Sequence, residues 1–488
     1  MSRFSKLLTF FTVLLISTAA FGEFILLHQK DGAALFGFLG RSVAGAGDVD
    51  GDGKADFIVG APQEFTDAGS AFVYSGATGA LLYQKDGPDS LSYFGFSVAG
   101  AGDVNGDGKA DFIVGAFMAA PGGLGNAGSA FVYSGADGSL LYQKNGAEFG
   151  AQLGISVAGA GDVNGDGKDD FIIGAWLADA PASNTGAAYL YSGASGALLY
   201  QKNGAFFDNL GISVAGAGDA NGDGRADFLV GAFHANSGNG SAYLYSGATG
   251  ALLYQKDGSG LFGASVSAAG DADGDGKADF IIGAPNALPG GLAVAGSAYL
   301  YSGATGALLY QKNGAAIGDH LGYQVAGAGD VDGDGKADFI VGVPNANPGG
   351  LADAGSAYLY SGADGSLIFQ KHGKAASDYL GLSVAGAGDL NGNGMADFMI
   401  GAALADPGGL ISAGSALVYS LCSAKGDLNA DGNLTPSDVV LILNCTFLGS
   451  GSCELCFADV NCDGMLTAAD AVDELNYVFL GIPLGGCP

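Results

Sequence analysis

The feature that most constrains the fold of this chain is an acidic segment that recurs seven times. The first copy, "DVDGDGKADFIVGAP", runs from Asp48 to Pro62 and crowds aspartates at alternate positions before a wholly apolar run. Further copies begin every 52 to 59 residues, at Asp103, Asp162, Asp219, Asp271, Asp330 and Asp389. Such a period is typical of proteins assembled from supersecondary units that bury their apolar faces against one another.

Each repeat contains four short apolar segments that are rich in Val, Ile, Phe and Tyr. Examples are "LLYQK" (81–85), "SVAGAGD" (97–103), "FIVGA" (112–116) and "GSAFVYSG" (128–135), with Gly, Asp and Asn between them. Such segments predict four antiparallel strands per repeat, and the glycines argue against helices. Seven four-stranded units predict a mainly β chain that forms a seven-bladed β-propeller. The small residues of "SVAGAGD" place that strand nearest the axis.

The two ends of the repeat region complement each other. The last repeat stops at "GSALVYS" (414–420) without a "QK" strand, whereas "LLHQKDG" (26–32) precedes the first acidic turn. We expect the N-terminal strand to complete the last blade, because this pairing removes an open sheet edge and closes the ring. An open solenoid, the alternative, would not need the ends to match. The predicted propeller domain covers residues 23–421.

The aspartates of each turn are spaced as metal ligands. In the first turn, positions 1, 3, 5 and 9 are Asp48, Asp50, Asp52 and Asp56, and position 7 (Lys54) can add its backbone carbonyl. Such an all-oxygen cage suits calcium better than magnesium. A hairpin turn rich in Asp and Gly is the alternative, but it explains one or two aspartates and not four at a fixed spacing. We expect one calcium ion per turn.

The other six turns supply the same positions with small changes. Position 3 is asparagine in four of them, and the seventh turn keeps only two carboxylates, so we expect it to bind calcium most weakly. The predicted ligands in these turns are Asp103, Asn105, Asp107, Lys109, Asp111, Asp162, Asn164, Asp166, Lys168, Asp170, Asp219, Asn221, Asp223, Arg225, Asp227, Asp271, Asp273, Asp275, Lys277, Asp279, Asp330, Asp332, Asp334, Lys336, Asp338, Asp389, Asn391, Asn393, Met395 and Asp397.

Three motifs together resemble the FG-GAP repeat of the integrin α-subunit head. They are "FG" (94–95), the DxDxDGxxD turn and "GAP" (60–62), and the resemblance covers about residues 24–420. It implies a seven-bladed β-propeller in which the turn between the first two strands of a blade binds calcium on one face. "LG" replaces "FG" in most repeats, and "GAF", "GAW" or "GAA" replaces "GAP" in four. Integrin ligands and partners do not transfer with the fold.

Residues 1–22 have the layout of a secretory signal peptide. Arg3 and Lys6 precede an apolar stretch from Leu7 to Ile16, and small residues follow it. A membrane anchor is the alternative, but this stretch is much shorter than the roughly 20 residues that span a bilayer. We therefore expect a secreted protein, extracellular or at the cell surface, with no transmembrane segment in the mature chain.

All six cysteines lie in residues 422–488, which we predict to be a separate domain. An even number of cysteines in an exported chain favours disulfides, although the sequence does not give their pairing. "CELC" (453–456) could instead be half of a zinc site, but no second pair stands at the right spacing.

This tail contains two segments with EF-hand loop spacing, "DLNADGNLTPSD" (427–438) and "DVNCDGMLTAAD" (459–470), each followed by an apolar segment of helical character. Residues 425–482 resemble a type I dockerin, which implies calcium-dependent docking onto a cohesin-like partner. A calcium-stabilised terminal domain without a partner is the alternative. The predicted tail ligands are Asp427, Asn429, Asp431, Asn433, Asp438, Asp459, Asn461, Asp463, Met465 and Asp470.

The strongly acidic composition follows from these predicted sites. The formal net charge is −31, and 29 of the 49 acidic residues are predicted calcium ligands. Seven ions in the propeller and two in the tail would change the net charge to −13. Most of the acidic residues therefore belong to predicted metal sites. The negative net charge excludes nucleic acid as a partner.

A partner or a reaction needs residues that break the repeat. The irregular loops follow the second and fourth strands, and in the FG-GAP geometry they share the face opposite the calcium turns. We predict that this face binds a protein or glycan, although these side chains could simply cover the blade ends. The candidate partner-binding residues are Phe117, Trp176, His234, His320 and Tyr379.

The sequence therefore favours a secreted, calcium-binding recognition or adhesion protein that is tethered through its tail. An extracellular polysaccharide hydrolase or lyase is the alternative, but no catalytic motif stands in a fitting context. A purely architectural role in a surface layer is a third possibility.

Overall fold

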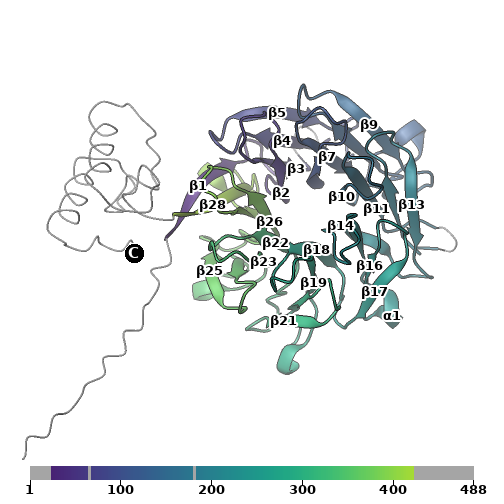
Figure 1. Ribbon diagram of the computed structural model, residues 1–488. Coiled ribbons are helices and arrows are strands. Elements are labelled where there is room, and N and C mark those ends of the chain that lie inside the picture. The colour runs from purple at the N-terminus through teal and green to yellow at the C-terminus, as the bar shows by residue number, and fades with distance from the viewer. Residues whose placement is uncertain (1–22, 64–67, 180–182, 423–488) are drawn as a thin grey trace, which may run out of the picture. The chain divides into compact units, whose positions relative to one another are not determined.

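Seven four-stranded sheets surround a common axis in the computed structural model of the chain, which describes residues 23–63, 68–179 and 183–422 (Figure 1). Within each sheet the paired strands run antiparallel, as in β6 to β9 of the second blade. The first strand of each blade lies nearest the axis and the fourth lies outermost, as β10 and β13 do (Figure 1). The predicted seven-bladed β-propeller is confirmed.

The first four blades follow one another along the chain. Blade 1 contains β2 (Ser42–Gly47), β3 (Asp56–Ala61), β4 (Ser70–Tyr74) and β5 (Leu81–Asp86). Blade 2 contains β6 (Ser97–Gly102), β7 (Asp111–Ala116), β8 (Ser129–Tyr133) and β9 (Leu140–Asn145). Blade 3 contains β10 (Ser156–Gly161), β11 (Asp170–Ala175), β12 (Ala187–Tyr191) and β13 (Leu198–Asn203). Blade 4 contains β14 (Leu210–Gly218), β15 (Asp227–Ala232), β16 (Ser241–Tyr245) and β17 (Leu252–Asp257).

The last three blades continue the pattern until the ring closes. Blade 5 contains β18 (Ser265–Gly270), β19 (Asp279–Ala284), β20 (Ser297–Tyr301) and β21 (Leu308–Asn313). Blade 6 contains β22 (Val325–Gly329), β23 (Asp338–Val343), β24 (Ser356–Tyr360) and β25 (Leu367–His372). Blade 7 contains β26 (Ser383–Gly388), β27 (Asp397–Ala402), β28 (Ser415–Cys422) and β1 (Glu23–Asp31).

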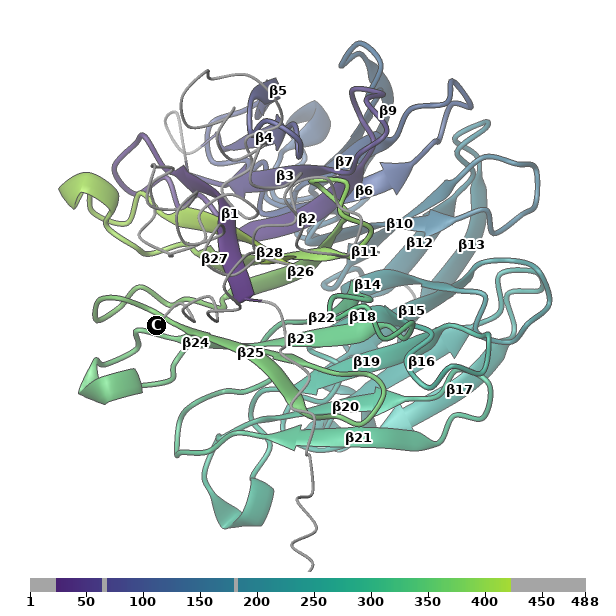
Figure 2. The same ribbon diagram turned by 60° about the vertical axis from the view of Figure 1, so that its left-hand side comes forward.

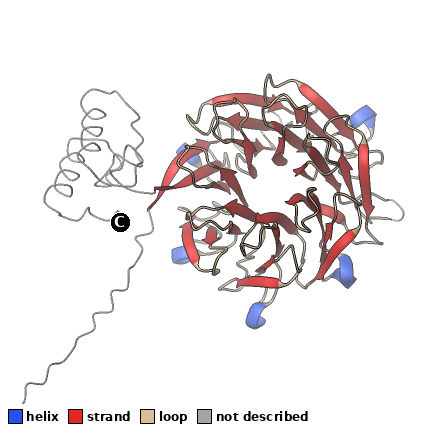
Figure 3. Cartoon of the chain, viewed as in Figure 1, coloured by secondary structure: helices blue, strands red, loops and turns tan. Residues whose placement is uncertain are grey.

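Helical structure in the described ranges is confined to single turns in the loops that follow second strands. These turns are α1 (Ala235–Gly238), η1 (Pro121–Gly123), η2 (Pro289–Gly291), η3 (Pro348–Gly350) and η4 (Pro407–Gly409). Figure 3 shows them at the periphery of the ring. Within residues 23–63, 68–179 and 183–422, no helix has the length and apolar character that a membrane span requires.

The small residues of the first strands allow seven backbones to converge on the axis. A Cβ atom added to Gly100 of β6 would lie 2.8 Å from the carbonyl oxygen of Gly45 in the neighbouring β2. Hydroxyl groups also bridge adjacent first strands, since the Val98 amide donates a hydrogen bond to the Ser42 Oγ at 3.1 Å. Bulkier side chains at the glycine position would push the strands apart.

The apolar core lies between the faces of adjacent blades. All six residues of each second strand are buried, so these strands contact the core on both faces. Between blades 2 and 3, Ile113 and Val132 pack with Phe171 and Ile173. Phe171 is fully buried, and its ring stacks on Tyr191 with the centroids 5.5 Å apart. The same Phe and Tyr pair recurs within the other blades. Across the blade boundary, Tyr142 of blade 2 stacks on Phe171 of blade 3 with the ring centroids 5.8 Å apart.

The "YQK" motif of the fourth strands fastens each blade to the next. The Tyr142 hydroxyl donates a hydrogen bond to the Gly193 carbonyl at 2.7 Å, and the Lys144 Nζ donates one to the Gly196 carbonyl at 2.6 Å. The Lys144 ammonium also lies 4.6 Å from the centre of the Tyr191 ring in the next blade. Five of these lysines form both a hydrogen bond and a cation–π contact across the blade boundary, namely Lys30, Lys144, Lys202, Lys256 and Lys312.

The N-terminal strand closes the ring, as the sequence predicts. Figure 2 shows the purple β1 beside the green strands of the last blade, where its hydrogen-bonded neighbour is β28. The Ser415 hydroxyl donates a hydrogen bond to Asp31 Oδ1 at 2.7 Å. His28 occupies the place of the "YQK" tyrosine, and its Nε2 lies 2.6 Å from the Gly76 carbonyl oxygen of blade 1. Burial lowers the pKa of His28, which keeps the ring neutral in this interface.

The predicted signal peptide (1–22) and the residues of the predicted dockerin-like domain beyond Cys422 lie outside the described residues. The expected helices, calcium loops and disulfides of that domain therefore stay predictions. The last strand extends to Cys422, two residues further than the "GSALVYS" motif indicates.

The closure generates a stability prediction. The Phe24 ring of β1 packs against the rings of Phe369 and Phe398, with centroids 5.0 and 5.6 Å away. We expect Phe24→Ala to lower the free energy of unfolding by about 2 kcal/mol, because it removes half-buried contacts that hold the last blade. Leu26→Ala is the matched control on an exposed position of the same strand and should change it by less than about 0.5 kcal/mol. Denaturant unfolding measures both, and equal small effects would contradict the closure.

Candidate functional site

The acidic turns connect the first and second strands of each blade on one face of the propeller. In the first turn, the carboxylate at position 1 organises the backbone around itself. Asp48 Oδ1 accepts a hydrogen bond from the Gly51 amide at 2.7 Å, and its Oδ2 accepts one from the Gly53 amide at 2.9 Å. Both glycines have positive φ angles, 82° and 88°, which a side chain would strain. The Asp and Gly spacing is thus required by the backbone of the turn.

The carboxylate at position 9 ties this turn to the third strand of the blade. Asp56 is completely buried, and its Oδ2 accepts a hydrogen bond from the Val49 amide at 2.8 Å. Its Oδ1 accepts another from the Gly76 amide, directly after β4, at 2.9 Å. The corresponding carboxylates of the other blades are also completely buried, namely Asp111, Asp170, Asp227, Asp279, Asp338 and Asp397.

Burial raises the pKa of these position 9 carboxylates. In the first five blades the pKa rises to about 6, and in the sixth and seventh it rises to about 7. Desolvation is the largest cause in every blade, and the backbone hydrogen bonds that lower the pKa only partly offset it. A nearby cation would compensate the buried negative charge.

Three turns bring carboxylates close enough to hold a metal ion together. Each group consists of the aspartates at positions 1, 3 and 9 of one turn. One carboxylate oxygen of each aspartate lies within 4.8 Å of those of the other two. The groups are Asp48, Asp50 and Asp56; Asp271, Asp273 and Asp279; and Asp330, Asp332 and Asp338. They are the three turns with four aspartates, so the donor set fits an oxygen-ligated cation such as calcium. The position 5 aspartates are not part of these groups.

The asparagine-bearing turns keep the same backbone geometry. Asn105 Oδ1 accepts a hydrogen bond from the Asp107 amide at 2.8 Å, as Asp50 Oδ1 does from the Asp52 amide at 3.0 Å. An asparagine oxygen at position 3 is therefore placed like a carboxylate oxygen, although it carries no charge.

The seventh turn departs from the others. In the other six blades a glycine amide donates a hydrogen bond to Oδ1 of the position 9 aspartate, but in blade 7 Leu421 replaces that glycine. Among the described residues, Asp397 Oδ1 has no hydrogen-bond partner, although it is buried. Its weaker calcium binding stays a prediction, but the orphaned oxygen is available to a cation.

Position 7 has a role that the sequence analysis missed. In four turns its lysine side chain reaches the preceding turn, where it donates a hydrogen bond to the backbone carbonyl at position 3. Among the described residues, the buried Arg225 Nη1 has no hydrogen-bond partner. Lys109 Nζ lies 2.7 Å from the Asp50 carbonyl oxygen, and Lys336 Nζ lies 3.1 Å from that of Asp273. Met395 holds this position in the seventh turn and packs against Gly333 without a charge. The signal was visible, because five of the seven turns have lysine here and one has arginine.

The loops after the second and fourth strands lie together on the opposite face of the propeller. Isolated parallel bridges join them, such as Gly128 with Leu153 and Gly296 with Leu321. The expected placement of the irregular loops is therefore confirmed. Among the described residues, all exposed large apolar side chains outside the outermost strands are on these loops: Leu35, Phe36, Leu91, Phe149, Phe206, Phe207, Leu288, Ile317, Tyr323, Leu351, Leu410 and Ile411.

One loop residue per blade is held in the left-handed region of backbone conformation. It directly precedes the "FG" or "LG" pair, its φ lies between 52° and 61°, and none of the seven is glycine. They are Phe38, Tyr93, Gln152, Asn209, Leu261, His320 and Tyr379. Non-glycine residues in this region cost roughly 1–3 kcal/mol each and gather at binding and switch sites.

The five candidate partner-binding residues all lie on this loop face but differ in exposure. Phe117 is buried under Phe96, with ring centroids 4.6 Å apart, so the expectation that it is exposed is wrong. Trp176 is half-buried, and its Nε1 donates a hydrogen bond to Gln152 Oε1 at 2.7 Å. His234 is exposed, and its Nδ1 lies 2.8 Å from Asn209 Oδ1.

His320 and Tyr379 share the strained position described above and are half-buried. Among the described residues, the His320 Nδ1 is buried without a hydrogen-bond partner. The two histidines lie on different blades, and the structure does not bring the five candidates together into one site.

In the absence of calcium, the folded protein should become less stable as the pH rises. The position 9 pKa values lie above the value of about 3.9 for a free aspartate, so the folded state binds more protons than the unfolded state. Without calcium, the free energy of unfolding should therefore fall as pH rises from about 4 to about 7. His28 acts in the opposite direction but is one group against seven. Denaturant unfolding in EDTA at pH 5 and pH 7 measures this, and stability that rises with pH would contradict it.

Replacing one position 1 ligand should separate metal binding from folding. We expect Asp48→Asn to lower the melting temperature more in calcium than in EDTA. In both conditions it removes one acceptor of a backbone hydrogen bond and relieves a repulsion between carboxylates, but only in calcium does it also remove a ligand charge. Asp89→Asn is the matched control, since Asp89 is exposed and outside the turns. The same loss with and without calcium would show that Asp48 is only structural.

Comparisons with known proteins agree with this geometry. The FG-GAP repeat family matches residues 39–74, 94–133, 153–191, 262–301 and 321–360, which are blades 1, 2, 3, 5 and 6 apart from their outer strands. The chain is 32% identical to integrin alpha-V of Gallus gallus over 211 residues, which is 40% of this chain and 20% of that protein. It is 34% identical to integrin alpha-4 of Xenopus laevis over 220 residues, 42% of this chain and 21% of that protein.

Integrin alpha-5 of Xenopus laevis is 32% identical over 215 residues, again 40% of this chain and 20% of that protein. The chain thus matches about a fifth of the length of these relatives. Blades 4 and 7 lie outside the family matches but have the same strand order as the others. The described part of the chain is therefore a seven-bladed β-propeller with FG-GAP repeats in five of its blades, and it is similar to part of the integrin α chains.

Proposed function

We propose that this protein is a secreted, calcium-binding recognition or adhesion protein. Its propeller binds a protein or glycan through the loop face, and its tail tethers it to another extracellular or cell-surface component. Similarity to integrin α chains over the FG-GAP repeats supports a role in recognition. The leader-like residues 1–22 support export.

The observation that carries this proposal is the asymmetric distribution of exposed apolar side chains. Apart from one leucine on the outermost strand of each blade, the exposed large apolar residues of the described ranges are all on the loop face. Phe149 is 76% exposed, and Phe206 is 62% exposed beside Phe207. Exposed aromatic residues that gather on one face indicate an interaction surface.

The strained loop positions support the same face. A glycine would adopt the left-handed conformation without strain, yet the seven positions hold four aromatic or imidazole side chains, two amides and a leucine. The scaffold therefore holds side chains of varied chemistry at one equivalent position in every blade. Such variation on a constant backbone is suited to recognition of an asymmetric partner.

Calcium would stabilise this scaffold from the opposite face. We propose up to nine ions, seven in the propeller turns and two in the tail loops. Bound in a turn, each ion neutralises carboxylates that otherwise repel one another, including the buried one at position 9. The three groups of clustered carboxylates are the best supported sites.

The tail would supply the tether through its dockerin-like loops. The proposal rests on the two segments with EF-hand spacing, 427–438 and 459–470. A cohesin-like partner would bind the tail in calcium and dissociate in EDTA. Binding that persists unchanged in EDTA would argue against a dockerin mechanism.

The loop face can be tested by matched substitutions on two surfaces. We expect Phe149→Ser, Phe206→Ser and Phe207→Ser together to abolish binding to a panel of immobilised glycans and extracellular proteins in calcium. The matched control replaces three exposed leucines of the outermost strands, Leu140, Leu198 and Leu252, by serine and should leave binding unchanged. Melting temperatures in calcium verify that both variants fold.

Equal loss of binding in both variants would contradict a specific loop face. Release of product from any polysaccharide in the panel would contradict a purely binding function and favour the hydrolase or lyase alternative.

A further inference from the structure

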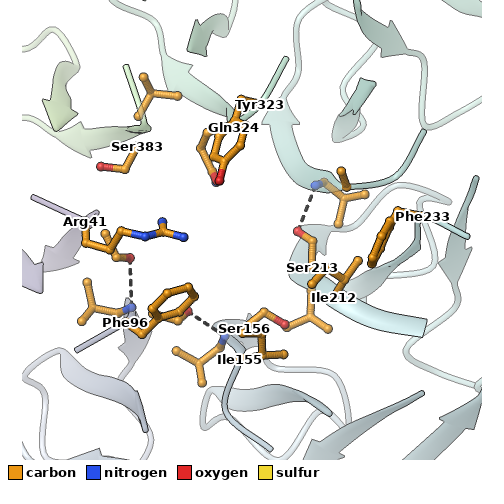
Figure 4. Close-up of a pocket in the computed structure, with 18 of the residues that line it drawn as sticks. Arg41, Phe96, Ile155, Ser156, Ile212, Ser213, Phe233, Tyr323, Gln324 and Ser383 are labelled. Atoms are coloured by element: carbon orange, nitrogen blue, oxygen red, sulfur yellow. Dashed lines mark hydrogen bonds between the residues drawn. The ribbon is translucent and has the colours of Figure 1, made fainter. Parts of the chain in front are cut away.

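The propeller axis holds a cavity that the proposed function does not use. Its volume is about 350 Å³, and residues at the loop-face ends of the first strands line it. Figure 4 shows these residues around the cavity, with side chains from different blades facing one another. A cavity of this size falls in the range of sites that bind small molecules.

One residue in the cavity breaks the symmetry of the repeat. The position after the "FG" or "LG" pair lines the cavity in the first six blades, and in five of these it is apolar or tyrosine. In blade 1 it is Arg41, which is the one charged residue among the described residues that line the cavity. A lone cation with no anion among the lining residues favours an anionic ligand.

Aromatic packing holds the Arg41 side chain in place. Its guanidinium carbon lies 4.2 Å from the centre of the Phe96 ring, and Figure 4 shows the side chain extending into the cavity. Phe96 is supported from behind by the buried Phe117, 4.6 Å away. In the ranges that the structure describes, no carboxylate forms an ion pair with Arg41, so its N–H groups are available to a ligand.

The other walls are partly apolar and partly polar, because Tyr323, Gln324 and five serines of the first strands also line the cavity, namely Ser42, Ser97, Ser156, Ser213 and Ser383. The five serine hydroxyls already take part in hydrogen bonds within the protein. Ile155 and Ile212 line the cavity together with Phe233, whose ring stacks on Trp176 at 5.8 Å. Tyr323 and Gln324 of blade 6 also face the cavity (Figure 4). Within the described residues, the side chains of Tyr323 and Gln324 form no hydrogen bond. Both can therefore donate a hydrogen bond to an oxygen of a bound ligand.

We propose that this axial cavity binds a small organic carboxylate with a flat apolar body. The planar fork of Arg41 matches the two oxygens of a carboxylate, and the apolar walls cover the body of the ligand. A neutral apolar molecule would leave the arginine desolvated without a partner, which is unfavourable. This site goes beyond the proposed function, because its ligand is a small molecule and the outer loops are not needed to bind it.

The test compares three probes on the full chain in calcium by isothermal titration calorimetry. Indole-3-propionate carries the charge and the flat apolar body, indole-3-propionamide carries only the body, and acetate carries only the charge. We expect indole-3-propionate to bind at least about tenfold more tightly than either of the others, because a charge-assisted pair and apolar burial are both required.

Two variants locate the binding at the cavity. Arg41→Gln should remove the preference for the carboxylate over the amide, whereas Lys374→Gln, the same loss of charge at an exposed position of the loop face, should keep it. Ala264→Phe should block binding by filling the cavity. It should fold, because Phe96 and Tyr323 occupy the equivalent position in other blades. Melting temperatures in calcium check folding.

Three results would overturn the proposal. They are no binding of indole-3-propionate to the wild-type chain, equal binding of the carboxylate and the amide, and unchanged binding in Ala264→Phe. The first two need no variant, so the proposal stays testable if Arg41→Gln does not fold. Loss of macromolecular binding in the loop-face variant with indole-3-propionate binding retained would separate this site from the proposed function.

Discussion

The fold depends on one buried carboxylate per blade, at position 9 of the acidic turn. Asp56 accepts hydrogen bonds from the turn that precedes it and from the backbone that follows the third strand, so it joins both hairpins of its blade. A buried charge is costly unless a cation or a proton compensates it. In three blades the clustered carboxylates at positions 1 and 3 could hold a cation beside it. Calcium binding in these turns would then stabilise the blade directly.

The ring transmits this stabilisation from blade to blade. The lysines at position 7 link successive acidic turns, and those of the "YQK" motif link successive outer strands. The N-terminal strand completes the series, with Lys30 donating a hydrogen bond to the Gly79 carbonyl at 2.7 Å. Because every blade is held on both sides, the loop face can carry strained and exposed residues without losing the fold.

Much of this architecture could be predicted from the sequence, because a motif that is uninformative as a single copy becomes informative when it recurs at a regular spacing. One "DVDGDGKAD" segment fits any turn, but seven at a regular spacing fix the blade number, the strand order and the closure by residues 26–32. Side-chain contacts between blades were not predictable, since a repeat pattern does not say which neighbour a side chain reaches. Phe117 was thus expected on the surface but packs under Phe96, and the role of Lys109 at the preceding turn was missed.

If the acidic turns bind calcium and so hold the strands of each blade together, the ions can be located directly in the anomalous difference map of a crystal grown in calcium. Peaks are expected in the turns of Asp48, Asp271 and Asp330, within ligand distance of the carboxylates at positions 1 and 3. Turns that are ordered in calcium but show no such peaks would contradict calcium binding.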